Sequence, residues 1–121
     1  MALALSGGIA KAAYGFKVAA AGVPMQLYWA TSVNPDCSSA GAVTIKVAAP
    51  PSHGRVTISR TGVFSIFSAT NVRQHCNTRR VAGVKAFYTS HRGYLGADRV
   101  AIDVIWPTGR YLRYDVNITV K

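Results

Sequence analysis

Apolar residues at every second position dominate the last quarter of the chain. In the segment 98–106 the apolar set is Val100, Ile102, Val104 and Trp106. In the segment 110–121 it is Leu112, Tyr114, Val116, Ile118 and Val120. A period of two puts alternate side chains on opposite faces of a strand. The pattern predicts two strands, each with one buried and one wet face, joined by a hairpin at Pro107–Gly109.

Shorter segments rich in aromatic and β-branched residues come before these two strands. They are 14–20, 25–32, 43–48, 55–60, 63–69 and 84–89. Proline and glycine separate them, and Thr61–Gly62 is expected to form a turn. The segment 70–83 is polar and basic, and its strand character is poor. Seven to eight short strands predict an all-β, antiparallel sandwich.

Composition bounds the size and the surface of the molecule. The 121 residues suit one domain. The chain has fourteen lysines and arginines but only four aspartates and no glutamate, which gives a formal charge of +10. Such a surface attracts phosphates, sulfates, anionic lipids and acidic polysaccharides at low salt, without implying specificity.

The N-terminal residues resemble part of a secretory leader. Residues 1–13 begin with a short apolar run and reach Ala10-Lys11-Ala12, an A-x-A pattern that could precede cleavage. A positive n-region is missing, and the run is too short to span a bilayer. We expect residues 1–13 to be a leader remnant or tail, and residues 14–121 to be the domain. The protein is expected to be periplasmic or secreted.

The two cysteines bear on the same question. Cys37 and Cys76 are far apart in the sequence and belong to no C-x-x-C pattern. A disulfide between them would close a loop of roughly 40 residues, worth roughly 4 kcal/mol in the chain-entropy model. Free buried thiols in a cytosolic protein are the alternative. The all-β, loop-rich pattern favours the disulfide and an oxidising compartment.

A glycine-punctuated segment, Gly93 to Asp98, comes just before the first alternating strand. Gly93 and Gly96 can adopt positive φ and form a tight corner. Asp98 can accept hydrogen bonds from backbone N–H groups that the corner leaves unpaired, and Tyr94 can bury its ring. Calcium needs six to eight oxygen ligands, which four scattered aspartates do not supply. The segment therefore predicts a structural turn rather than a metal site.

Several short motifs occur in an order that resembles a known family. They are Pro51-Ser52-His53-Gly54-Arg55-Val56, Phe87-Tyr88-Thr89, Gly93-Tyr94-Leu95-Gly96-Ala97-Asp98, Gly109 and Val116-Asn117-Ile118-Thr119-Val120. Over residues 43–121 the chain resembles bacterial immunoglobulin-like and cadherin-like domains. It departs from their pattern at Ser90, where they have proline, and in the long basic segment 62–83. The resemblance implies an immunoglobulin-like sandwich, an exported setting and a structural role for His53 and Gly54.

No sequence pattern favours catalysis or a cofactor. The histidines at positions 53, 75 and 91 have no zinc-like spacing with the cysteines, and a disulfide would use up both thiols. No serine elbow, phosphate-binding loop or dinucleotide motif is present. Asp103 and Asp115 share strand faces with arginines, which favours cross-strand ion pairs over paired catalytic carboxylates. We therefore expect a protein that is not an enzyme and needs no metal.

The segment 73–80 is the most distinctive basic stretch. It contains Arg73, His75, Arg79 and Arg80 around Cys76. A disulfide would make it a rigid loop suited to phosphate or sulfate, although a solvated loop is the simpler interpretation. Aromatic residues interleaved with basic ones are not evident here, so nucleic acid is less favoured. We expect an adhesion, scaffold or interaction module, or alternatively a binder of an anionic envelope or extracellular polymer.

Overall fold

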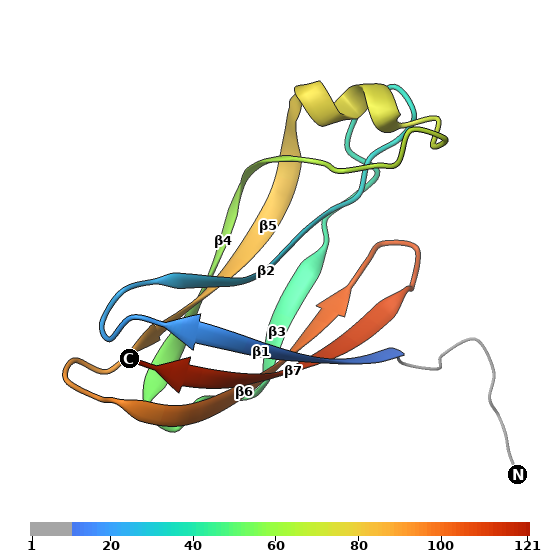
Figure 1. Ribbon diagram of the computed structural model, residues 1–121. Helices are drawn as coiled ribbons and strands as arrows, with labels where there is room; N and C mark the ends of the chain where they lie inside the picture. Colours follow the sequence, from blue (N-terminus) through green and yellow to red (C-terminus); the bar gives the residue numbers. More distant parts are fainter. Residues whose placement is uncertain (1–10) are drawn as a thin grey trace, which may run out of the picture.

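The computed structural model describes residues 11–121 as an all-β fold with one short 3₁₀ helix (Figure 1). Its elements are β1 (Lys11–Ala19), β2 (Met25–Thr31), β3 (Thr44–Ala49), β4 (Gly54–Phe64), η1 (Gln74–Thr78), β5 (Arg80–Ser90), β6 (Gly96–Ile105) and β7 (Tyr111–Val120). Within these residues no helix has the length and apolar character to cross a membrane. The expected leader falls largely on residues 1–10, outside the described part. Lys11–Ala13, expected in the tail, belong to β1.

The strands form two sheets. One has the order β1-β7-β6-β3 and the other β2-β5-β4. All strand pairs are antiparallel except β1 with β7, which are parallel. The expected purely antiparallel arrangement is therefore wrong at this edge. The short connection after β1 leads into β2 of the other sheet, so β1 pairs with the last strand instead of with its neighbour in sequence (Figure 1).

The main apolar core lies between the two sheets, and a second, smaller cluster contains Val33, Val63 and Val81. Val100, Ile102, Val104, Val116 and Ile118 are all nearly inaccessible to solvent. They belong to one cluster with residues of the other sheet: Leu27, Ala30, Val84, Ala86 and Tyr88. The predicted alternation in β6 and β7 is confirmed, and so is the connection at Pro107–Gly109. The arrangement is sandwich-like, because both sheets bury one face against each other.

The expected turn at Thr61–Gly62 is wrong. Both residues lie inside β4, where they pair with Gly83 and Ala82 of β5. β5 also begins at Arg80, earlier than the predicted strand. These two stretches have weak strand character alone, but each supplies the other's hydrogen-bond partners. Gly62 is extended here, and a Cβ on it would lie 2.4 Å from Cγ of Arg80.

The edge strand β1 differs from the other strands of its sheet. Its outward face presents Tyr14, Phe16 and Val18 to solvent, and Phe16 is 84% exposed. On the neighbouring strand the outward partners of Phe16 and Val18 are Asn117 and Thr119, which are polar. The sequence predicted a strand over 14–20 but not which of its faces is covered, and at this edge the apolar side chains of Tyr14, Phe16 and Val18 are exposed.

Candidate functional site

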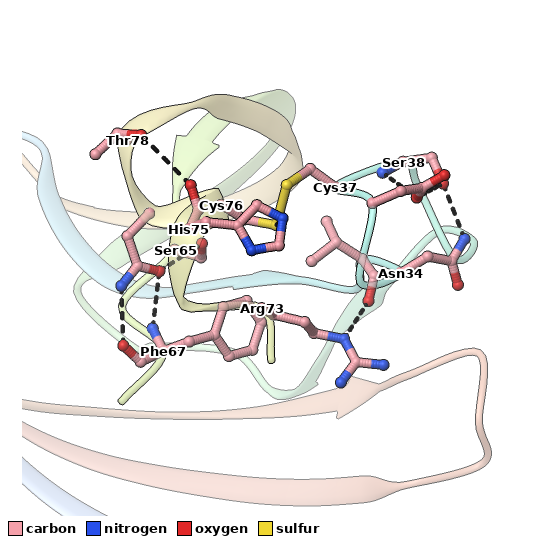
Figure 2. The surroundings of a disulfide bond; sticks show 12 residues. Asn34, Cys37, Ser38, Ser65, Phe67, Arg73, His75, Cys76 and Thr78 are labelled. Atoms are coloured by element: carbon pink, nitrogen blue, oxygen red, sulfur yellow. Dashed lines mark hydrogen bonds between the residues drawn. A yellow bond between two sulfur atoms is a disulfide. The ribbon is translucent and has the colours of Figure 1, made fainter. Parts of the chain in front are cut away.

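A disulfide joins Cys37, in the loop between β2 and β3, to Cys76 in η1 (Figure 2). The S–S distance is 2.09 Å and the Cα atoms are 5.5 Å apart. Cys76 is fully buried, whereas Cys37 is partly exposed. The predicted bond is therefore present, and it ties the basic segment 73–80 to the loop between β2 and β3.

Side-chain hydrogen bonds hold the rest of this segment in place. The Asn77 amide accepts from the Phe67 backbone N–H at 2.9 Å and donates to the Phe67 carbonyl at 2.9 Å. Ser65 donates to the same amide oxygen at 3.0 Å. Dashed lines in Figure 2 mark the hydrogen bonds around Ser65 and Phe67. Arg73 donates through Nε to the Val33 carbonyl at 2.8 Å. The loop is thus a constrained part of the fold and not a loose tail.

The four basic residues predicted here have different neighbours. Arg73 is partly buried by its bond to Val33, while His75, Arg79 and Arg80 are exposed. The guanidinium of Arg80 lies over the Phe64 ring, 5.6 Å from its centroid. The structure brings these residues to one end of the molecule, but each side chain that makes a hydrogen bond or ring contact does so with a different partner: Arg73 with Val33, His75 with Cys76 and Arg80 with Phe64.

His75 also lies beside the disulfide. Its Nε2 is 3.8 Å from Sγ of Cys76, and the ligand atoms of Cys37, His75 and Cys76 lie within 4.8 Å of one another. A metal would need the cysteines as thiolates, and the disulfide uses both sulfur atoms. While the disulfide is intact, neither cysteine can therefore act as a thiolate ligand.

The corner around Asp98 is built from four hydrogen bonds to one buried carboxylate. The backbone N–H groups of Ser52, His53 and Arg99 donate to it at 3.0, 3.1 and 2.9 Å. The Tyr88 hydroxyl donates at 2.6 Å. Burial acts to raise the pKa of Asp98, but these hydrogen bonds outweigh it and hold the pKa below its usual value.

The neighbouring residues complete this corner. His53 and Tyr94 stack with ring centroids 3.9 Å apart and planes 4° from parallel. Gly93 and Gly96 have φ of 78° and 131°, a region that favours glycine. Gly54 sits against Tyr88, where a Cβ would lie 2.7 Å from the ring. The residues expected to build this turn therefore lie in one corner: His53, Gly54, Gly93, Tyr94, Gly96 and Asp98.

Tyr88 is the member of this corner that sequence reasoning did not assign. The sequence around Tyr88 indicated only that its side chain lies in a strand of aromatic and β-branched residues, which is now β5. Burial and the hydrogen bond to Asp98 raise the pKa of Tyr88, so the phenol stays protonated and donates. Its partner lies on another strand across the corner, and alternation within one strand does not reveal such a contact.

Ion pairs use two further aspartates on the outward face of β6 and β7. Arg99 contacts Asp115 at 2.8 Å, and Arg113 and Tyr111 both contact Asp103. The Arg113 hydrogen bond is the main reason that the pKa of Asp103 is lowered. Cross-strand pairing of these aspartates with arginines, expected from the sequence, is what the structure has.

A groove that the sequence did not reveal lies between the edge strands β1 and β2. Its volume is about 700 Å³. Five aromatic side chains line it: Tyr28, Trp29, Phe67, Trp106 and Tyr114. Lys17 and Arg110 are its charged residues, and Arg110 lies 4.3 Å from the centroid of the Trp106 ring. The aromatic residues come from three separate segments, so their meeting depends on the tertiary fold.

Comparison with known proteins adds little to this geometry. No family model matches the sequence, and no curated protein matches it. Among solved structures, one described as the solution structure of amebosin is similar, with a TM-score of 0.44 and 8% identity. The match covers 90% of this chain and 98% of that chain.

Proposed function

We propose that the protein is a non-catalytic, exported interaction module of the immunoglobulin-like class, which binds an anionic partner through its basic surface. The fold assignment is supported by the sheet orders β1-β7-β6-β3 and β2-β5-β4, in which β1 pairs with the last strand, β7, and not with β2, its neighbour in the sequence. The disulfide supports an oxidising, extracytoplasmic setting.

The imbalance between paired carboxylates and free cations carries this proposal. Within residues 11–121, Arg99 and Arg113 are the cationic residues that form ion pairs. The remaining two aspartates are engaged by neutral donors, with Asp98 held in its corner and Asp36 bonded to Ser38. The other lysines and arginines therefore present positive charge that the described residues do not neutralise.

The experiment is binding of the purified protein to acidic polymers of different chemistry. Polygalacturonate, polyphosphate and a sulfated dextran are compared with neutral dextran over a range of salt concentrations. Binding to at least one acidic polymer, weakening steeply as salt rises, is expected. Equal affinity for neutral dextran, or no affinity for any acidic polymer, would refute the proposal.

The basic segment 73–80 is a second candidate surface for the same partner. It is supported by the exposure of Arg79 and Arg80 on a segment that the disulfide and Asn77 hold in place. Replacing Arg79 and Arg80 with alanine tests it. A specific site here predicts a loss of affinity well beyond that of a pair of substitutions with the same charge change elsewhere, such as Arg55→Ala with Lys85→Ala.

A further inference from the structure

We propose that the groove between β1 and β2 binds a stretch of an acidic polysaccharide, with sugar carboxylates on Lys17 and Arg110 and sugar rings on the aromatic side chains. The inference rests on the proposed function, because it takes the partner to be an anionic polymer. It names the site and the chemical class of that polymer.

The charge of the groove is entirely positive. Its lining contains Lys17 and Arg110 and no aspartate or glutamate. Neither cation has a carboxylate within ion-pair distance among residues 11–121. Arg110 is also held in place, because its guanidinium lies over Trp106 and its carbonyl accepts the Trp106 backbone N–H at 2.9 Å. A positioned guanidinium favours a carboxylate, which it can bind through two parallel hydrogen bonds.

The aromatic lining suits the other part of such a ligand. The ring centroids of Tyr28 and Tyr114 lie 5.7 Å apart, and each of the five aromatic side chains is only partly buried. Pyranose rings have apolar C–H faces that pack on aromatic rings, and their hydroxyl groups need polar neighbours such as the Gln26 amide. Gly15 makes room for this lining, since a Cβ there would lie 2.3 Å from the Tyr114 hydroxyl.

The position of the groove favours a polymer over the chain's own N-terminus. β1 and β2 are both edge strands, so the groove opens along the side of the sandwich and a chain can enter and leave it. Residues 1–10 contain no acidic side chain and would leave Lys17 and Arg110 without a counter-charge. An acidic sugar chain complements both the charge and the aromatic faces.

Tryptophan fluorescence provides a readout specific to this site. The chain has two tryptophans, and both Trp29 and Trp106 line the groove. A short oligomer of galacturonic acid is titrated into the protein at fixed, moderate salt, with a neutral galactose oligomer of the same length as the control. We expect the emission to change saturably with the acidic oligomer and to remain constant with the neutral one.

Two double variants with equal charge change locate the site. Lys17→Ala with Arg110→Ala removes the groove cations, and Arg55→Ala with Lys85→Ala removes two cations of β4 and β5 that line neither the groove nor the basic segment 73–80. Because the groove variant loses two charge-assisted contacts, its affinity for the acidic oligomer should fall at least about tenfold. The affinity of the other variant should stay within about twofold of wild type. Thermal unfolding of both variants establishes that each is folded.

The outcomes separate this inference from the proposed function. Equal weakening in both variants would mean that binding follows net charge. Loss of affinity in the Arg79→Ala, Arg80→Ala variant but not in the groove variant would place the site at the basic segment 73–80. Either result overturns the groove assignment and leaves the function standing. Binding to polyphosphate or sulfated dextran without binding to the uronate overturns the assignment of the groove to a carboxylate-bearing sugar chain and also leaves the function standing. An emission change on deleting residues 1–10, without ligand, would show that the chain's own segment occupies the groove and would also overturn the inference.

Discussion

The Tyr88 hydroxyl donates a 2.6 Å hydrogen bond to Oδ2 of Asp98, and both side chains are buried. This contact links β5 of one sheet to the start of β6 of the other. The same carboxylate accepts backbone N–H groups of Ser52 and His53, just before β4. Asp98 is thus a single acceptor on which three segments converge, and it fixes one end of the sandwich.

Removal of the Tyr88 hydroxyl tests this role. Tyr88→Phe keeps the buried ring but leaves a buried carboxylate with one donor fewer. We expect a loss of about 1–3 kcal/mol in the free energy of unfolding, measured by urea denaturation. Tyr94→Phe is the control, because its hydroxyl donates to the Ala97 carbonyl at the surface. Its cost should stay below about 1 kcal/mol, and equal costs for the two variants would contradict the role of Asp98.

The lowered pKa of Asp98 predicts how stability depends on pH. The folded-state pKa lies below the unfolded value of about 3.9, so the carboxylate stabilises the fold above that pH. Stability is then lost as the pH falls through the folded-state pKa. Asp98→Asn should lower stability at neutral pH and flatten its decline between about pH 4 and pH 2. Thermal unfolding across this range gives both curves, and parallel curves for variant and wild type would refute the prediction.

The disulfide predicts a large, reductant-sensitive contribution to stability. The cysteines are 39 residues apart in the sequence, and closing such a loop is worth about 4 kcal/mol in the chain-entropy model. Replacing Cys37 and Cys76 together with serine should lower the free energy of unfolding by roughly this amount. A phosphine reductant should destabilise the wild type and leave the double variant unchanged. If the reductant leaves the free energy of unfolding of the wild type unchanged, the bond has no role in stability.

Alanine substitution at two glycines of β4 is expected to cost different amounts of stability. A Cβ at Gly54 would lie 2.6 Å from the Thr89 carbonyl oxygen and 2.7 Å from the buried Tyr88 ring, and neither can move away. Gly54→Ala should cost about 1–3 kcal/mol of stability, by overpacking. At Gly62 the neighbour is the exposed Arg80 side chain, which can change rotamer, so Gly62→Ala should cost less than about 1 kcal/mol. Calorimetric unfolding of the two variants checks the contrast, and a reversed order would contradict it.

Features that depend on local periodicity could be predicted from the sequence. The alternating strands that became β6 and β7, the hairpin at Pro107–Gly109 and the all-β class follow from side-chain period and turn chemistry. The link between Cys37 and Cys76 followed from counting cysteines in a strand-rich chain. Each of these depends on residues close in sequence or on a pairing with only one solution.

The tertiary structure alone decided which distant residues meet. The parallel pairing of β1 with β7, the continuity of β4 through Gly62 and the Tyr88–Asp98 contact all depend on a partner from another segment. The aromatic groove exists only because the edge strands β1 and β2, the β6–β7 hairpin and the segment 65–67 after β4 come together. Periodicity says which face of a strand is apolar, but the side chain that packs against it is chosen when the two sheets come together.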